Sequence, residues 1–354
     1  MKKLSLILIY SILSFSLFSQ GIKPVSIFFE TNSKELRSTS HNYATPLILN
    51  KNIIREIINN NLAFSANKGF IGNIDLATGK VFATNIKQDS IFPEFRSIAH
   101  TTTDVFVLSV ANPALLYKTG ENGQFELVYK EEAENVFYDA MTFWNDKEGM
   151  AIGDSMNGCL AIIITRDGGL TWTKQKCSLL PEGIEGEGAF AASNTNIKVI
   201  GDKTWVATTK GRILFSNDKA KTWKVIQTPI INTEPTQGIY SIDFYDELTG
   251  FAIGGDYTKP ESKEQNKAMT IDGGKTWQLV AQNENPGYKS CVQFVPNSQG
   301  KGLVAIGFTG ISYSNNMGSS WKQLSDEGFF TIRFKNDSIA YAAGKGRVAK
   351  LIFK

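Results

Sequence analysis

An eight-residue pattern that recurs four times constrains the fold more strongly than any other feature of the sequence. Its copies occupy residues 165–172, 216–223, 270–277 and 314–321. Each copy begins with Ser or Thr, has Asp or Asn two positions later, and ends on Trp. Successive tryptophans, from Trp172 through Trp223 and Trp277 to Trp321, are 51, 54 and 44 residues apart. Repeats of about 40–50 residues that hold four short strands are typical of β-propellers, so the pattern predicts an all-β propeller.

Seven repeat units can be counted from Ile53 to the end of the chain. In the clear units, two strand-like segments joined by a polar turn precede the tryptophan, as at residues 141–144 and 149–153. Two fainter units cover residues 53–84 and 97–129. Because the first unit is faint, six or eight units are the alternatives. The pattern predicts a seven-bladed β-propeller over residues 53–354.

The last unit lacks a fourth strand, which suggests how the ring closes. It has only three strand-like segments, the last at residues 351–353. Residues 25–30 (Val-Ser-Ile-Phe-Phe-Glu) are rich in β-branched and aromatic side chains, as strands are. Pairing these two segments would remove an open sheet edge. We therefore expect residues 20–52 to be a closing strand followed by a linker.

The repeated turn is predicted to hold the fold together rather than to carry chemistry. Its Asp or Asn can accept hydrogen bonds from N–H groups of the same turn, glycine provides positive φ, and Trp is a large apolar anchor. Ala220 replaces a glycine in the second copy, a change that still allows part of the turn. The residues given this structural role are Asp167, Trp172, Asp218, Trp223, Asp272, Trp277, Asn316 and Trp321.

This pattern resembles the Asp-box, or BNR repeat, of sialidases, sortilin-like receptors and the photosystem II stability/assembly factor family. The resemblance to the last family runs from residue 53 to the C-terminus and rests on residues 137–144, 186–193, 287–291 and 344–351. The chain is most similar to its exported, non-photosynthetic bacterial branch. The resemblance implies a seven-bladed propeller that acts as a scaffold or assembly factor, without implying photosystem II as its partner.

The N-terminus has the character of an export signal. Lys2 and Lys3 precede an apolar stretch over residues 4–18, which is too short to span a bilayer comfortably. We expect residues 1–19 to be removed by cleavage after Ser19, which leaves Gln20 first; an uncleaved anchor is the alternative. The mature protein is then exported to the periplasm or the medium and has no membrane span.

Three cysteines leave at least one without an intramolecular partner. Cys159 and Cys177 lie symmetrically about Gly168, at the tip of the first clear repeat turn. A hairpin at this turn would place the two cysteines opposite each other on neighbouring strands, within disulfide range. The alternative is two buried thiols. Cys291 lies in an apolar strand pattern and is predicted to belong to the core.

Composition and motifs argue against several classes of function. The formal net charge of +3 is small for 354 residues, and no run of Lys or Arg suggests nucleic-acid binding. The two histidines, His41 and His100, have no Cys or His nearby, so no metal site is predicted. No Gly-x-Gly-x-x-Gly follows a predicted strand, so no dinucleotide cofactor is predicted either.

Strand order fixes which residues share a face of the propeller. We call "first face" the face that carries the turns joining strands one to two and three to four of each blade, where all the Asp-boxes lie. The "second face" carries the second-to-third turns and the crossings between blades. Candidate binding residues on the second face are Arg96, Asp139, Asp154, Glu187, Asp256, Tyr288 and Lys289. Capping of turns and pairing of charges across the channel are the alternative roles of these residues.

Three functions are compatible with this sequence. The first is a rigid scaffold that binds a protein partner on its second face. The second is a sialidase-like glycoside hydrolase, which would need three arginines around one point. The chain has seven: Arg37, Arg55, Arg96, Arg166, Arg212, Arg333 and Arg347. The third is a carbohydrate-binding propeller without catalysis. We expect the protein scaffold, and predict no catalytic residue.

Overall fold

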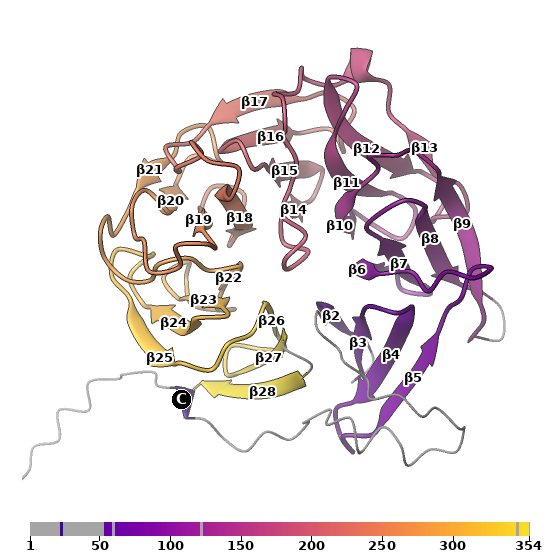
Figure 1. The fold of residues 1–354 in the computed structure, drawn as a ribbon. Coiled ribbons are helices and arrows are strands. Elements are labelled where there is room, and N and C mark those ends of the chain that lie inside the picture. Colours follow the sequence, from indigo (N-terminus) through magenta and orange to yellow (C-terminus); the bar gives the residue numbers. More distant parts are fainter. Residues whose placement is uncertain (1–21, 24–52, 59–60, 121–122, 345–346, 354) are drawn as a thin grey trace, which may run out of the picture.

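Seven four-stranded antiparallel sheets form a ring in this computed structural model. The structure describes residues 22–23, 53–58, 61–120, 123–344 and 347–353. The sheets radiate from a common centre with their innermost strands nearest the axis (Figure 1). The chain is therefore a seven-bladed, all-β propeller, as the repeat predicts.

The strands follow one another from the axis outward in each blade. Blade 1 contains β2 (Ile53–Ile58), β3 (Asn61–Ser65), β4 (Phe70–Asp75) and β5 (Val81–Asn85). Blade 2 contains β6 (Phe95–His100), β7 (Val105–Ser109), β8 (Ala114–Thr119) and β9 (Phe125–Glu131). Blade 3 contains β10 (Tyr138–Phe143), β11 (Gly149–Met156), β12 (Cys159–Thr165) and β13 (Thr173–Lys174). Blade 4 contains β14 (Ile197–Ile200), β15 (Lys203–Ala207), β16 (Arg212–Ser216) and β17 (Lys224–Gln227).

The remaining blades keep this order. Blade 5 contains β18 (Gln237–Phe244), β19 (Gly250–Asp256), β20 (Lys267–Thr270) and β21 (Gln278–Leu279). Blade 6 contains β22 (Cys291–Phe294), β23 (Leu303–Gly307), β24 (Gly310–Ser314) and β25 (Lys322–Ser325). Blade 7 contains β26 (Thr331–Phe334), β27 (Ile339–Gly344), β28 (Arg347–Phe353) and β1 (Ile22–Lys23).

The outer strand of blade 7 comes from the opposite end of the chain. Ile22 pairs with Phe353 and Lys23 with Ile352. The two paired residues precede residues 25–30, the stretch that the sequence predicts as the closing strand. Residues 25–30 lie outside the described residues. This two-residue pair covers part of the outer edge of β28.

Apolar packing between neighbouring blades forms the core. Burial is complete in the inner strands of blade 5, where every residue of β18 and β19 is buried. The outer strands are exposed instead, as in β17 and β25. One core cluster joins Phe106 and Leu108 of blade 2 to Tyr138, Ala151 and Trp172 of blade 3. Each blade therefore depends on its neighbours for burial.

The four repeated turns share one pattern of hydrogen bonds, with one bond reversed in direction in the last copy. Asp167 Oδ1 accepts from the Thr165 hydroxyl at 2.8 Å and from the Thr171 N–H at 3.0 Å, and Oδ2 accepts from the Thr171 hydroxyl at 2.6 Å. Equivalent bonds form around Asp218 and Asp272. Asn316 Oδ1 accepts from the Ser314 hydroxyl and the Ser320 N–H, but its Nδ2 donates to the Ser320 hydroxyl. The acidic or amide side chain is thus fully used within its turn, which fits the structural role predicted for it.

A glycine in each complete turn also makes room for the preceding blade. A Cβ atom on Gly169 would lie 2.2 Å from the Phe106 ring, and one on Gly318 would lie 2.2 Å from the Phe251 ring. Ala220 keeps the left-handed backbone, with φ of 63°, and is buried in the same core cluster as Met150 of the preceding blade. The turn therefore packs against the preceding blade as well as connecting two strands of its own blade.

Candidate functional site

The central channel is filled by the protein's own chain. Residues 193–196 (Ser-Asn-Thr-Asn), here called the channel plug, precede β14 and are all buried. In Figure 1 a loop beside β14 reaches toward the middle of the ring. The plug ends a long crossing over residues 175–196, whereas the next crossing covers only residues 228–236. This extra length allows the chain to reach the axis.

Hydrogen bonds tie the plug to five other blades. Asn194 Nδ2 donates to Ile98 O at 3.0 Å, and Asn194 Oδ1 accepts from Met141 N at 2.9 Å. On the other side, Thr195 donates to the Ser241 hydroxyl at 2.7 Å and contacts Cys291 Sγ.

The backbone carbonyl of Ser193 completes this set. It accepts from the Thr331 hydroxyl at 3.2 Å and from Arg333 Nη2 at 3.3 Å. The plug therefore joins β6, β10, β18, β22 and β26 across the axis, and the centre of the propeller is a packed, hydrogen-bonded core.

Three of the innermost strands have a register shift at their second-face end. The register shifts between Phe95 and Ser97 in β6, between Tyr138 and Ala140 in β10, and between Ile239 and Ser241 in β18. The residues at the shifts are Arg96, Asp139 and Tyr240. A bulge re-aims the side chain that it carries, so the same local device sets the direction of Arg96, Asp139 and Tyr240 at this end of their strands. Asp139 and Tyr240 are buried there.

Arg96, Asp139 and Asp154 come together at blades 2 and 3. Asp139 is fully buried, and neither carboxylate oxygen has a partner at ordinary hydrogen-bond geometry among the described residues. Burial and then the nearby charge of Asp154 raise the pKa of Asp139 well above its usual range, while the Ala189 amide and Arg96 oppose this. Burial raises the pKa of Asp154 to about 6.

The Glu187 side chain does not join that group and forms a buried ion pair, although the Glu187 carbonyl accepts from the Ser155 N–H at 2.8 Å. Arg212 Nε donates to Glu187 Oε1 at 2.8 Å, and Nη2 donates to Oε2. Glu187 Oε2 also accepts from the Ile184 N–H at 3.0 Å. The carboxylate is 1% exposed and fully engaged, so the structure does not present Glu187 as a free binding group at the channel mouth; it anchors the crossing that leads to the plug.

Five aromatic side chains form what we call the aromatic platform on the second face. They are Phe190, Tyr240, Tyr257, Tyr288 and Phe308. Phe190 stacks on Tyr240 with ring centroids 3.6 Å apart, and Tyr288 meets Tyr240 edge-on at 4.7 Å. Tyr257 lies 6.5 Å from both tyrosines and is 48% exposed. Buried rings thus support an exposed one, an arrangement suited to rigid contact with a partner.

Of the other three predicted site residues, Asp256 and Lys289 form hydrogen bonds that stabilise loops near this platform. Asp256 Oδ1 accepts from the N–H and the hydroxyl of Thr258, so it caps the start of the loop that holds Tyr257. Lys289 is 2% exposed, and its Nζ donates to Thr309 Oγ1 and Gly310 O. Burial lowers the pKa of Lys289 to about 8. Tyr288 belongs to the platform itself.

Sequence reasoning missed the plug, Phe190 and Tyr240. A signal was present, since Ser193-Asn-Thr-Asn196 is a polar run where the chain otherwise approaches an apolar strand. Such a run is expected where backbone and side-chain groups of several strands need partners. The two aromatic residues gave no local signal, because their proximity depends on blade geometry.

Cys159 and Cys177 form a disulfide with Cα atoms 5.5 Å apart. Their setting differs from the expected pair of opposed strand positions. Cys159 begins β12, but β13 ends at Lys174, and Cys177 lies in the short 3₁₀ helix η3 (Cys177–Leu179) beyond it. The bond therefore fastens the start of the long crossing to blade 3. Cys291 is buried and unpaired.

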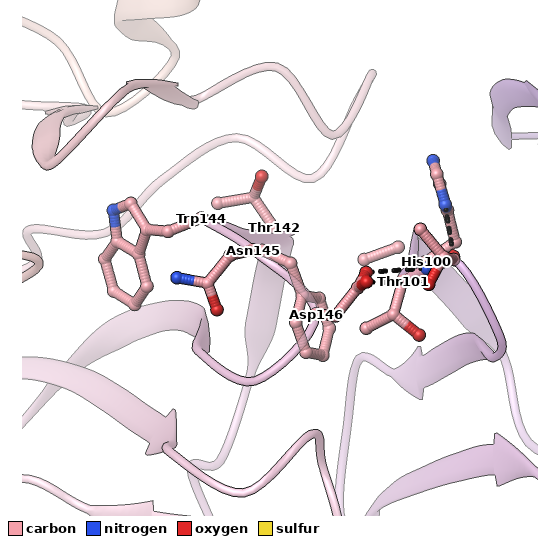
Figure 2. A pocket seen from close by; sticks show the side chains of 9 residues that line it. His100, Thr101, Thr142, Trp144, Asn145 and Asp146 are labelled. Atoms are coloured by element: carbon pink, nitrogen blue, oxygen red, sulfur yellow. Dashed lines mark hydrogen bonds between the residues drawn. The ribbon is translucent and has the colours of Figure 1, made fainter.

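A small pocket of about 180 Å³ opens on the first face between blades 2 and 3. Figure 2 shows His100 and Thr101 on one side and Trp144, Asn145 and Asp146 on the other. Its polar groups make local bonds: His100 Nδ1 bonds Thr101 O, and Asp146 accepts from the N–H and hydroxyl of Thr102. The pocket is thus a junction between blades whose polar groups are used internally.

Neither a metal centre nor a membrane helix emerges from the described part of the chain. It contains no group of three or more His, Cys, Asp or Glu side chains placed to hold a metal ion. Within the same residues, no helix has the length and apolar character needed to cross a bilayer.

The fold defines the class as a seven-bladed β-propeller, and its axis is filled by its own chain. The chain is similar to the solved structure of YCF48 bound to D1 peptide, with TM-score 0.63 and 11% identity over 87% of this chain and 95% of that one. It is also similar to YCF48 from Cyanidioschyzon merolae, with TM-score 0.61 and 12% identity over 88% and 97% of the two chains.

A propeller of another kind is nearly as similar. The WD40 domain of Neurospora crassa Pan2 gives TM-score 0.60 and 14% identity over 86% of this chain and 89% of that one. At these identities the similarity establishes the fold alone. No protein-family model matches the chain, and no curated protein matches its sequence.

Proposed function

We propose that this chain is an exported relative of the photosystem II assembly-factor propellers and acts as a rigid protein-binding scaffold. Its partner docks on the second face, over the plugged channel and the aromatic platform. The observation that carries the proposal is the plug, because a filled axis leaves a continuous surface in place of an axial ligand cavity. The similar YCF48 structure holds a peptide, which supports the same type of activity here.

The described arginines favour this function over the hydrolase. Arg96 pairs with Glu94, Arg166 with Glu148, Arg212 with Glu187 and Arg347 with Glu327, while Arg333 bonds the plug. These five side chains have five separate sets of partners, and Arg166 lies in a first-face turn. A sialidase-like clamp needs three arginines that converge on one carboxylate, a geometry that these five do not form.

Export is part of the proposal. The apolar stretch over residues 4–18 supports export. The disulfide, whose Cys177 is exposed, supports an oxidising compartment such as the periplasm or the medium. N-terminal sequencing of the secreted protein should find Gln20 first. A cell-associated product that retains Met1 would contradict it.

Affinity capture with two matched variants tests the scaffold function. Tyr257→Ala removes an exposed side chain from the second face of blade 5. Ile271→Ala removes one from a first-face turn of the same blade, where Ile271 is 67% exposed. We expect wild type and Ile271→Ala to retain a common protein, which then binds directly when purified, and Tyr257→Ala to lose it. Equal retention by both variants, or binding to glycans alone that Tyr257→Ala abolishes, would contradict the proposal.

A further inference from the structure

The crossings between blades carry a marked excess of negative charge. All six described crossings from blade 1 to blade 7 contain at least one exposed acidic residue. These ten residues, here called the crossing carboxylates, are Asp89, Glu94, Glu132, Glu134, Glu182, Glu185, Glu234, Glu284, Asp326 and Glu327. Against them stand two exposed crossing lysines, Lys87 and Lys176.

This excess is local, because the whole chain has a formal net charge of +3. The second-to-third turns on the same face are mixed: Lys259 and Lys263 lie beside Glu261 and Glu264. The surplus of negative charge therefore belongs to the crossings. A face whose charge opposes that of the whole chain produces its own field for an approaching partner.

Seven of the ten crossing carboxylates have no ion-pair partner among the residues that the structure describes. Three do: Glu94 pairs with Arg96, Glu132 with Lys130 and Glu327 with Arg347. Exposed charges that are not neutralised internally keep their full attraction for an outside charge, subject to screening by salt.

Unpaired carboxylates also flank the aromatic platform. Glu185 belongs to the crossing that supplies Phe190. Glu284 belongs to the crossing that supplies Tyr288. Glu234 lies in the crossing whose Thr236 carbonyl accepts from the Tyr240 hydroxyl at 2.9 Å. Every crossing that builds or braces these three rings therefore contributes an exposed glutamate.

The aromatic platform and the exposed glutamates together favour one kind of side chain on a partner, that of arginine. An arginine guanidinium stacks on an exposed tyrosine face and pairs with carboxylates in the same contact. Tyr257 offers an exposed ring, and the three exposed glutamates belong to the crossings that build or brace the platform beneath it. A carboxylate-rich partner would meet repulsion at the same place.

We propose that the second face recognises a cationic protein segment, rich in arginine, that lies in extended form across the aromatic platform. This inference deepens the scaffold function and rests on it. Tyr257 provides stacking contact, and Glu185, Glu234 and Glu284 provide charge complementarity. The segment needs no axial cavity, since the plug closes the channel beneath it.

Peptide binding tests the proposal with defined probes. Fluorescence anisotropy compares an alternating Arg-Pro peptide with the same peptide bearing glutamate for arginine. We expect wild type to bind the cationic peptide at least tenfold more tightly, and this binding to weaken as salt rises from about 0.05 to about 0.5 M. Equal binding of the two peptides, or no binding of the cationic one, would overturn the proposal.

Two triple variants with the same charge change locate the site. The first triple variant combines Glu185→Gln, Glu234→Gln and Glu284→Gln. It should weaken binding of the cationic peptide about tenfold, because each glutamate would form an exposed ion pair of modest strength. Asp202→Asn, Glu247→Gln and Asp337→Asn together remove three exposed first-face charges and should have little effect. Equal weakening by both triples would refute second-face recognition.

The captured partner separates this inference from the scaffold function. A partner that is lost with Tyr257→Ala but retained by the second-face triple, through a segment without Lys or Arg, would overturn charge recognition and leave the scaffold function standing. A partner that Tyr257→Ala retains would contradict the scaffold function itself.

Discussion

The carboxamide of Asn194 accepts a hydrogen bond from the backbone N–H of Met141 at 2.9 Å, at the axis of the propeller. The same carboxamide donates to Ile98 O, so one side chain joins blades 2 and 3 from a third segment. These partners are buried, and removing the amide would leave them unsatisfied, at a cost of about 1–3 kcal/mol each.

Asn194→Ala should therefore lower the free energy of unfolding by about 3 kcal/mol. Chemical denaturation measures this change. Asn157→Ala is the control, because Asn157 has the same left-handed backbone, with φ of 57° against 58° for Asn194, but is exposed. If both variants lose equal stability, the cost comes from the backbone conformation and the plug hydrogen bonds contribute nothing.

The buried pair of Glu187 and Arg212 should show strong energetic coupling. Arg212→Met or Glu187→Leu alone leaves a buried charge without its partner and should cost about 3–5 kcal/mol. The double variant removes both charges and should lose much less than the sum of the two. A double-mutant cycle measured by urea unfolding gives this coupling, and additive losses would show that the pair does not anchor the crossing.

Asp139 and Asp154 should make stability fall with rising pH. The pKa values of both carboxyls are raised in the folded protein, so they retain protons that the unfolded chain releases above pH about 3.9. The free energy of unfolding therefore decreases as pH rises through this window toward the raised pKa values. Asp139→Asn removes one titrating group and should raise stability at pH about 8, by about 2 kcal/mol, and flatten the profile.

Asp272→Asn is the control with the opposite sign. Burial acts to raise the pKa of Asp272, but hydrogen bonds from Thr276 and Thr270 outweigh it and lower this pKa to about 2. The charged form is thus favoured by folding, and its contribution is lost only as pH falls below about 3.9. Asp272→Asn should lower the melting temperature at neutral pH. Thermal unfolding across pH that shows the same sign for both variants would contradict the assignment of these two environments.

The disulfide should stabilise the fold by constraining the unfolded chain. Cys159 and Cys177 are separated by 18 residues, and a loop of this size corresponds to about 3 kcal/mol. The variant Cys159→Ser with Cys177→Ser should be destabilised by about this amount, whereas reductant should shift the melting temperature of the wild type only. Mass spectrometry without reductant should find the two cysteines joined; free thiols at both would refute the bond.

The blades were predictable because their signal is local and repeated. The Trp-to-Trp spacing, the alternation of strands and turns, and the Asp or Asn at four of the third-to-fourth turns can all be read along the chain. Asp167 makes the hydrogen bonds within its own turn that its sequence context predicts. Interactions between neighbours in sequence thus carried most of the fold prediction.

The site was less predictable because it depends on distances between blades. Arg96, Asp139 and Asp154 were expected on the second face, and the structure brings these three together. Nothing local indicates that Glu187 is sealed against Arg212, or that Asn194 reaches Ile98, which is 96 residues away. The disulfide shows the same limit on a smaller scale: the symmetry about Gly168 suggested a strand pair, but β13 ends before Cys177.

Photo-crosslinking in the native compartment tests the central claim most directly. A photoreactive phenylalanine analogue is placed at Tyr257 on the second face, or at Ile271 on the first face of the same blade. The scaffold account predicts a defined protein adduct from position 257 that position 271 does not give. Adducts from position 271 alone, or the same adducts from both positions, would contradict it.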